Sequence, residues 1–277
     1  MAACRTLGAR LPAEARLASD PYGASFAPAP LEWLVRHLPG PATVPAWPFV
    51  LYMQVRTRAI DDVLRRFVAD GGTQVLILGA GYDCRAARFA DDLTRTHVFE
   101  VDHPATQASK REQLGKLAGY PVDAARYVTC NFEREDPIER LVACGFSQLE
   151  PALVIWEGVV PYLTEGAIRA TASRLATGLD PRSLVAFDFV GKKLATGQGL
   201  NDKDLKTRDY VGELGEPIRY GTDDILPLLH DCGFRWVRVL DFNELALEFL
   251  GDYQRERQFR FQRVALAATR VPDASWP

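Results

Sequence analysis

The sequence predicts an α/β fold with a doubly wound, mostly parallel sheet, and three observations lead to this prediction. Apolar segments of strand length alternate with segments of helix length between residues 51 and 190. These apolar segments are nearly continuous, which is typical of buried parallel strands. The first of them, QVLIL, runs directly into the turn GAG. Right-handed crossovers between such strands would place helices on both faces of the sheet.

The first 50 residues depart from this alternation because they are rich in proline and alanine. Their prolines would break any long helix, and they stand at Pro21, Pro28, Pro30, Pro39, Pro41, Pro45 and Pro48. We therefore expect short helical pieces and turns in residues 1–50, which would form an N-terminal helical cap. Residues 51–277 form the main domain in this prediction.

The main domain opens with a helix at 51–70, where apolar residues recur at near-helical spacing until Gly71 and Gly72 end it. The apolar runs predict five strands, at 73–80, 96–102, 125–132, 151–158 and 182–190. Between and after these strands we expect helices at 82–92, 104–119, 137–144 and 164–179. Pro137 would open the third of these helices, and Thr164 would cap the fourth.

The part of the chain after the fifth strand is more varied. Residues 191–220 are polar and rich in glycine, so we expect a loop that closes over the site as a lid. A helix at 222–232, a strand at 234–241, a charged segment at 244–260 and a last strand at 261–270 follow.

Composition narrows the possible partners. The net charge of −3 gives no reason to expect a nucleic-acid or membrane partner, and no apolar run is long enough to span a bilayer. The N-terminal residues MAACRTLGAR lack the apolar core of a secretory signal. The five cysteines never form a C-x-x-C pair and the four histidines lack ligand spacing, which is typical of a cytoplasmic protein with reduced thiols and no metal site. We expect a small-molecule substrate, and the composition leaves the oligomeric state open.

The turn after the first expected strand is the first candidate for ligand binding. Ligands of open α/β sheets bind beyond the carboxyl ends of the strands, and Gly79 and Gly81 stand at such an end. Because glycine has no Cβ, a ligand could contact the main chain there. A dinucleotide-binding turn would have a third glycine where this chain has Cys84. A tight turn without a ligand is the alternative interpretation.

Polar side chains also stand at the ends of the next three strands. Asp102 ends the second strand, with Glu100 on the same face, and a carboxylate at this position can accept both ribose hydroxyls of an adenosine. Asn131 and Phe132 end the third strand, where an amide and an aromatic ring could bracket an adenine. Glu157 follows four apolar residues of the fourth strand, where a charge needs a partner or a cationic ligand. The alternative for the acidic residues is a strand end exposed to solvent. The alternative for Asn131 is an ordinary turn residue.

Two arginines on the first helix of the main domain are candidates for binding an anionic group. Arg56 and Arg58 lie in the segment VRTRAIDD, and either guanidinium could bind a carboxylate through two hydrogen bonds. An arginine-rich surface helix is the alternative interpretation of the same pattern.

These segments resemble the leucine carboxyl methyltransferase family. The likeness lies in VRTRAIDD, LILGAGYDCRAARF, VFEVDHP, WEGVVPYLT and GEPIRYGTDDILPLLHDCGF, and so covers most of the chain. Within the family, the chain is similar to bacterial O-methyltransferases of the tetracenomycin carboxyl-methylating kind, which are associated with polyketide pathways. Their N-terminal Arg-Ala and Asp-Pro-Tyr pattern resembles ARLASDPYGASF. The resemblance implies a class I methyltransferase sheet, similar to a Rossmann fold, and S-adenosyl-L-methionine as the cofactor.

The resemblance also implies roles for individual residues. Arg56 matches the arginine that meets the methionine carboxylate of the cofactor, and Asp102 matches the acid that binds the ribose. Asn131 departs from the family, which has aspartate there, but its carbonyl could still accept a hydrogen bond from the adenine amino group. The implied cofactor-binding residues are Arg56, Gly79, Gly81, Asp83, Asp102, Asn131, Phe132 and Glu157.

The implied reaction is methyl transfer to an oxygen, and it needs little covalent help from the protein. Attack on a sulfonium methyl group is an in-line displacement, so positioning and exclusion of water would supply most of the acceleration. A carboxylate acceptor is already ionised at neutral pH and needs no base, which favours it over a hydroxyl. Tyr22 and Tyr162 are candidates for the substrate cavity, and His103 is more consistent with a structural role.

Two other functions remain open at this point. A nicotinamide-dependent oxidoreductase could use Gly79, Gly81 and Asp102 as a dinucleotide site, although the missing third glycine and Glu157 count against it. A catalytically silent nucleoside-binding protein would keep the same pocket, because a displacement reaction leaves no obligatory nucleophile in the sequence.

Overall fold

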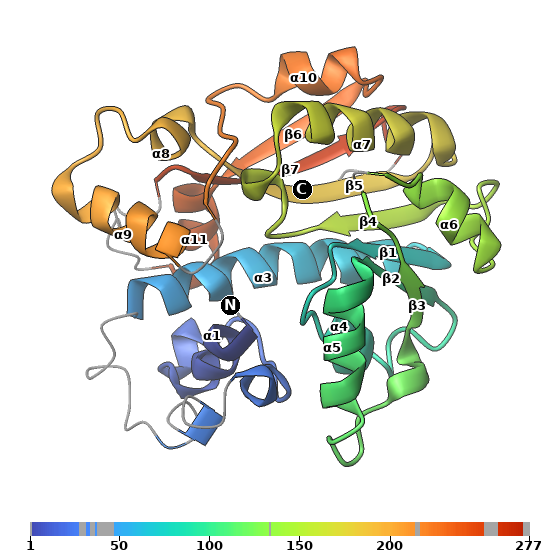
Figure 1. The fold of residues 1–277 in the computed structure, drawn as a ribbon, viewed down its shortest axis with the longest axis horizontal. Helices are drawn as coiled ribbons and strands as arrows, with labels where there is room; N and C mark the ends of the chain where they lie inside the picture. Colours follow the sequence, from blue (N-terminus) through green and yellow to red (C-terminus); the bar gives the residue numbers. More distant parts are fainter. Residues whose placement is uncertain are drawn as a thin grey trace.

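A seven-stranded sheet lies at the centre of the computed structural model, which describes residues 2–27, 32–33, 37, 47–132, 134–213, 217–251 and 260–273 (Figure 1). The strand order is β3-β2-β1-β4-β5-β7-β6, and β7 runs opposite to the other six strands. The strands are β1 (Gln74–Leu78), β2 (His97–Asp102), β3 (Arg126–Thr129), β4 (Ala152–Trp156), β5 (Leu184–Val190), β6 (Trp236–Asp241) and β7 (Gln262–Ala268). Each lies within the range expected from its apolar run, so the doubly wound, mostly parallel sheet is confirmed.

The position of β1 in the sheet decides where a ligand can bind. From β1 the chain moves outward to β2 and β3, and it then returns to place β4 on the other side of β1. Ile77 therefore pairs with Glu100 on one side and with Ile155 on the other. A crevice opens at such a reversal, beyond the carboxyl ends of the two strands.

Helices cover both faces of the sheet (Figure 1). One face packs against α3 (Trp47–Ala69), α4 (Arg85–Arg88) and α11 (Phe242–Leu250). The other packs against α6 (Pro137–Ala143), α7 (Glu165–Gly178) and α10 (Leu226–Asp231). The central strands are buried on both faces, which explains their continuous apolar sequences.

The described N-terminal residues consist of short pieces, as expected. They form α1 (Ala2–Leu7), followed by the 3₁₀ turns η1 (Gly8–Arg10), η2 (Ala13–Ala15) and η3 (Gly23–Phe26). This segment lies beside α3, on the side away from the sheet, where Leu11 and Val50 share a small apolar cluster (Figure 1). Of the prolines expected to break helices in this cap, all except Pro21 and Pro48 lie outside the described residues.

Three expected helices are shorter than their patterns suggested. One of them is the helix expected at 222–232, which is α10 (Leu226–Asp231) and begins only after Asp224, whose side chain accepts a hydrogen bond from the Leu226 amide at 2.9 Å. The helix expected at 82–92 is wrong in extent, because only Arg85–Arg88 is helical and turns follow it. Its second half contains Asp91 and Asp92, whose side chains compete with helical hydrogen bonds. The helix expected at 104–119 is α5 (Pro104–Leu114), and Gly115 follows it as the cap residue.

The segment 191–220 is not a simple loop, so the expected loop is wrong, while its role as a lid stays a prediction. It contains α8 (Lys192–Thr196) and α9 (Asp202–Glu213). The sequence of α9 is polar on all sides and has no apolar periodicity, which is why a helix was not expected there. Asn201 explains its start, because the Asn201 side chain accepts a hydrogen bond from the Asp204 amide at 2.9 Å, and acidic residues occupy the first turn.

The remaining expectations lie close to the observed bounds. The Thr164 side chain accepts a hydrogen bond from the Ala167 amide at 3.3 Å, so Thr164 is the N-cap of α7 as predicted. The charged segment expected at 244–260 begins within α11, and residues 252–259 lie outside the described part. Among the described helices, none combines the length and apolar character that a membrane-spanning segment requires.

Candidate functional site

The turn after β1 has the conformation that its glycines allow. Gly79 has φ +64° and Gly81 has φ +46°, both in the left-handed region that other residues rarely adopt. A Cβ on Gly79 would lie 2.5 Å from Cγ2 of Val159, so the chain is tightly packed there. A Cβ on Gly81 would approach only the Gly79 carbonyl, at 3.9 Å, within the described part of the molecule. The space above Gly81 is therefore open to a ligand.

Asp102 connects this turn to the end of β2. Its carboxylate accepts a hydrogen bond from the Gly81 amide and another from the His103 amide, the latter at 2.6 Å. The turn and the strand end are thus held together across the point where the strand order reverses. Each carboxylate oxygen can accept more than one hydrogen bond, so these contacts leave capacity for ligand hydroxyls.

The structure separates the two candidate arginines of α3. Arg56 is buried, and its Nε donates to Oε1 of Glu157 at 2.8 Å. Nη1 of Arg56 donates to Asp188 at 2.9 Å and to the Tyr52 hydroxyl at 3.1 Å. Arg58 instead has a side chain that is 38% exposed and pairs with Asp62 on the same helix. Only Arg56 of this pair lies at the carboxyl edge of the sheet.

Glu157 already has protein partners, so a cationic ligand is not required to compensate its charge. Oε2 of Glu157 lies 2.6 Å from Nη2 of Arg85, and Oε1 is bound to Arg56. Burial raises the pKa of Glu157, but the guanidinium groups of Arg85 and Arg56 outweigh this and hold it at about 2. Glu157 is therefore ionised at neutral pH and fixed between two arginines.

Arg85 extends the ion network to the turn after β1. Its Nε donates to Asp61 of α3 at 2.8 Å, and its Nη1 donates to the Asp83 carboxylate. Burial opposes ionisation of Asp83, but the neighbouring Arg85 and Arg5 hold its pKa well below the usual range. This contact accounts for the position of Asp83 just beyond the second glycine, where it fixes the start of α4.

Sequence reasoning missed several members of this network. Asp61, Arg85 and Asp188 had no assigned role, although each is buried at the carboxyl edge. A signal existed for Asp188, because it interrupts the apolar strand LVAFDFV as Glu157 interrupts the run at the end of β4. No comparable signal marks Asp61, since acidic residues are common on helix surfaces.

Asn131 and Phe132, the two residues expected beside an adenine, follow β3, the strand next to the one that ends in Asp102. The Cys130 amide donates to the Asp102 carbonyl at 2.9 Å, so Asn131 and Phe132 follow directly beyond that contact. The Asn131 amide donates to the Glu135 carboxylate at 2.7 Å, and Phe132 is partly buried against the core on the α6 and α7 face. Their contact with a nucleoside remains a prediction.

The two tyrosines expected near the substrate lie in different parts of the edge. Tyr22 makes an edge-to-face contact with Tyr120, with ring centroids 4.8 Å apart, beside the turn after β1. Tyr162 is partly buried in η6 (Val160–Tyr162), which follows β4. His103 has the structural role expected of it, because its Nδ1 accepts a hydrogen bond from the Ala105 amide at 3.3 Å and caps α5.

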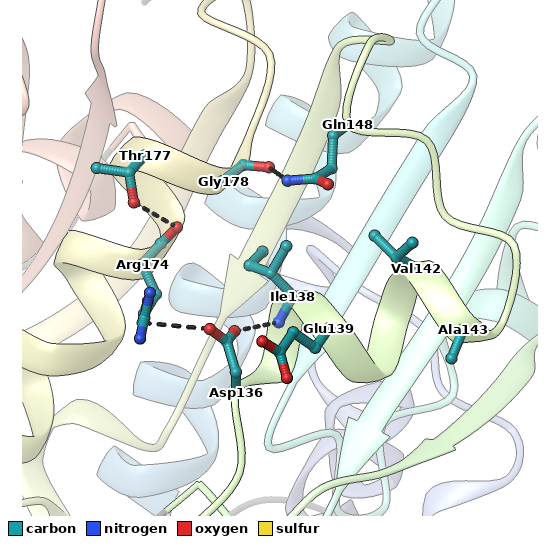
Figure 2. Close-up of a pocket in the computed structure, with 9 residues that line it drawn as sticks. All are labelled: Asp136, Ile138, Glu139, Val142, Ala143, Gln148, Arg174, Thr177 and Gly178. Atoms are coloured by element: carbon teal, nitrogen blue, oxygen red, sulfur yellow. Dashed lines mark hydrogen bonds and ion pairs between the residues drawn. The ribbon is translucent and has the colours of Figure 1, made fainter.

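A hollow of about 520 Å³ lies elsewhere, between α6, α7 and the segment before β4 (Figure 2). Arg174 pairs with Asp136 across it at 3.2 Å, and Gln148 donates to the Gly178 carbonyl at 2.9 Å (Figure 2). Gln148 precedes β4 and Gly178 ends α7, so this end of the hollow lies at the amino edge of the sheet. Its lining contains none of the residues predicted to bind the cofactor.

Relatives of the chain are found among bacterial proteins named as methyltransferases. A Streptomyces coelicolor protein, provisionally named an S-adenosyl-L-methionine-dependent methyltransferase, is 37% identical over 183 residues, which is 62% of this chain and 58% of that protein. A Mycobacterium tuberculosis protein of the same provisional name is 38% identical over 135 residues, 48% of this chain and 42% of that protein. The chain thus spans about half the length of these curated relatives. A third such protein, from Mycolicibacterium gilvum, is 31% identical over 231 residues, 79% of this chain and 71% of that protein.

Solved structures share the fold at low sequence identity. A provisionally named methyltransferase from Thermobifida fusca superposes with a TM-score of 0.58 at 14% identity, covering 97% of this chain and 94% of that chain. The CMeT domain of the citrinin polyketide synthase superposes with a TM-score of 0.52 at 12% identity, covering 83% of this chain and 58% of that chain. Together with the strand order, these likenesses confirm the class I methyltransferase fold.

The family is decided by sequence. The model of the family described as leucine carboxyl methyltransferase matches residues 1–176, which is more than half of the chain. That stretch includes the N-terminal segment, the turn after β1, Asp102 and the buried Arg56 and Glu157. The chain belongs to the leucine carboxyl methyltransferase family.

Proposed function

We propose that the chain binds S-adenosyl-L-methionine and transfers its methyl group to an oxygen of a small or medium-sized molecule, with a carboxylate as the favoured acceptor. The observation that carries this proposal is the Asp102 carboxylate, bonded to the Gly81 amide at the carboxyl edge where the strand order reverses. A carboxylate in this place is suited to ribose hydroxyls, and the open space above Gly81 admits the ligand.

Arg56 would meet the carboxylate of the methionine part. Its Nε and Nη1 donate to Glu157, Asp188 and Tyr52, and none of these three bonds uses Nη2. The two N–H groups of Nη2 are therefore the donors left for a ligand carboxylate. Asn131 and Phe132, beyond β3, would lie beside the adenine.

The net charge of the buried side chains at the carboxyl edge of the sheet also favours a positively charged ligand. The buried charged side chains described at this edge comprise seven carboxylates and five cations: Asp20, Asp61, Asp83, Glu100, Asp102, Glu157 and Asp188, against Arg5, Arg56, Arg85, Arg88 and Lys110. Carboxylates are in excess, and a buried excess of one sign favours a ligand of the other. When bound, S-adenosyl-L-methionine supplies an activated methyl group on a positively charged sulfur.

The residues of the edge are arranged to bind and orient rather than to accept a proton. Glu157 is fixed between Arg56 and Arg85, with its pKa held at about 2. The Asp102 carboxylate is engaged by two main-chain amides. Burial raises the pKa of the Tyr52 hydroxyl far above neutrality. This arrangement favours an acceptor that is already ionised at neutral pH, which supports a carboxylate over a hydroxyl.

Two segments would exclude water during the reaction: residues 1–50 as a cap, and residues 191–220 as a lid-like insertion. Nη2 of Arg5 donates to the Tyr82 carbonyl at 2.8 Å, so the N-terminal segment touches the turn after β1. In the second segment, Asp204 of α9 pairs with Arg260 at 3.1 Å. Closure of such segments over a site is a common way to exclude water from a displacement reaction.

Titration calorimetry with S-adenosyl-L-methionine and S-adenosyl-L-homocysteine tests the cofactor. Both should bind, and NADH should not. Asp102→Ala should weaken binding by about 1–3 kcal/mol, because ribose hydroxyls lose their acceptor. Asp62→Ala, on the exposed side of α3, is the matched control and should bind like the wild type. Wild-type affinity in Asp102→Ala would refute the ribose assignment.

The acceptor is tested with labelled methyl donor and an extract of the source organism. A methyl ester should release methanol in mild alkali, whereas a methyl ether is stable. For a carboxylate acceptor, the rate should be nearly flat from about pH 6 to 9, since the nucleophile has a pKa near 4. A labelled product that resists alkali would overturn the carboxylate assignment and leave the methyltransferase proposal intact.

A further inference from the structure

Lys110 of α5 is among the most deeply buried charged residues of the described chain. Its side chain is 1% exposed, whereas lysine is rarely buried without a specific partner. Nζ of Lys110 donates to the carbonyl of Asp83 at 2.5 Å and to Oε2 of Glu100, also at 2.5 Å. The Glu100 side chain is equally buried. The two charges compensate each other away from solvent.

The two partners of Lys110 belong to the two segments that meet at the proposed ribose site. Asp83 lies two residues beyond Gly81, and Glu100 lies two residues before Asp102. Gln107 fastens the same helix to the sheet, because its Nε2 donates to the carbonyls of Glu100 and Val128 at 3.1 Å each. Lys110 therefore links α5, strand β2 and the turn after β1 through one ammonium group.

Stability alone is a weak explanation for this ion pair. Desolvation of two buried charges offsets much of their attraction, and an apolar pair of similar volume is often at least as stable. Oε1 of Glu100 has no hydrogen-bond partner in the described part of the molecule. Burial raises the pKa of Glu100 to about 7 even though Lys110 opposes this. Burial of this pair therefore lowers stability, and an apolar pair could fill a purely structural role without that loss.

We infer that Lys110 is a positioning residue for the cofactor. Its bond to the Asp83 carbonyl fixes the main chain of the turn relative to β2, so that the Gly81 amide points at the Asp102 carboxylate. Lys110 does this from behind the turn and does not itself touch the ribose. The inference rests on the proposed function, because it concerns the site for S-adenosyl-L-methionine.

The test compares a variant in which the side chain that accepts from Lys110 is neutral with a variant that also lacks the Lys110 ammonium group. Glu100→Gln keeps Lys110 and an oxygen that accepts from it, so S-adenosyl-L-homocysteine should bind within about threefold of wild type. The double variant Glu100→Gln/Lys110→Met removes both charges and the donor to Asp83, and should bind at least about tenfold more weakly than Glu100→Gln. Lys116→Met, an exposed lysine just beyond α5, is the matched control and should change nothing.

Melting temperature and affinity separate positioning from structure. We expect the double variant to lose affinity while it melts close to Glu100→Gln. A folded double variant that binds S-adenosyl-L-homocysteine within twofold of Glu100→Gln would overturn the inference. If the wild type binds neither S-adenosyl-L-methionine nor S-adenosyl-L-homocysteine, it is the proposed function that fails.

Hydrogen exchange on the full wild-type chain gives a second test that depends on no variant. If Lys110 fixes the turn in advance, the amides of Asp83 and Arg85 should exchange slowly before ligand is added. They donate to the Ala80 carbonyl and to the Asp83 side chain, each at 2.7 Å. Fast exchange at both amides that becomes slow only on addition of S-adenosyl-L-homocysteine would contradict the inference.

Discussion

At the scale of single residues, the ion network around Glu157 carries the strongest prediction for stability. Glu157→Gln should lower the free energy of unfolding by about 3–5 kcal/mol, because it leaves the buried guanidiniums of Arg56 and Arg85 without a shared counter-ion. Asp62→Asn breaks only ion pairs of the partly exposed Arg58 and Arg65, and should cost about 1 kcal/mol or less. Urea denaturation measures both, and equal losses would contradict the network.

The same residue scale gives a prediction for pH. The pKa of Glu100 rises from 4.5 to about 7 in the folded protein, so the folded state holds this proton more tightly than the unfolded chain. Its contribution to stability is complete below about pH 4.5 and is lost as the pH rises to about 7. Glu100→Gln lacks this loss. Its melting temperature relative to wild type should therefore rise across that interval, and a constant difference would contradict the shift.

Residues at strand ends could be predicted from the sequence, but their partners could not. Asp102 and Glu157 stand out because each ends an apolar run. Asp61 and Lys110 lie on helices among other charged residues, and only the folded chain shows that they point inward. Ion pairs such as Arg56 with Glu157 join positions 101 residues apart, a separation that no local pattern encodes.

At the scale of elements, strands were predicted well because burial on both faces leaves a continuous apolar run. Helix α9 was missed because its stability comes from its cap and its charged first turn, not from an apolar stripe. Helix α4 was expected to extend to residue 92, but it ends at Arg88, before Asp91 and Asp92, whose side chains compete with helical hydrogen bonds.

In the turn after β1, one glycine is expected to matter for stability and the other for ligand binding. Gly79→Ala should destabilise the protein, because its Cβ would lie 2.5 Å from Val159 at positive φ. Gly81→Ala incurs backbone strain at φ +46° but meets open space, so its larger effect should fall on binding of S-adenosyl-L-homocysteine. Denaturation and calorimetry on both variants check this contrast, and reversed effects would show that the open space is not the ligand site.

At the scale of the whole molecule, the strand order could not be read from periodicity. Alternation predicts a parallel sheet, but the position of β7 between β5 and β6 depends on long-range pairing. The resemblance to the leucine carboxyl methyltransferase family implied a class I methyltransferase sheet, and the structure has that fold. Local patterns thus predict the elements, and the family resemblance supplies the fold class but not the pairing of β7 with β5 and β6.

The attachment of the N-terminal segment to the sheet domain gives the last prediction. Asp20 is the centre of this attachment, because its buried carboxylate accepts from Nε of Arg5 at 2.9 Å and from the amides of Tyr22 and Gly23 at 3.0 and 2.9 Å. Arg5 in turn reaches the Tyr82 carbonyl in the turn after β1. Loss of Asp20 should therefore release the segment from the site while the sheet stays folded.

Asp20→Ala should speed amide exchange throughout residues 2–27 and leave the central strands unchanged, because the segment would open locally. Binding of S-adenosyl-L-homocysteine should weaken severalfold if the segment caps the cofactor. Glu14→Ala, at an exposed position of the same segment, is the control. If both variants exchange and bind alike, the segment does not depend on Asp20. If exchange rises but affinity does not fall, the segment packs against the domain without capping the site.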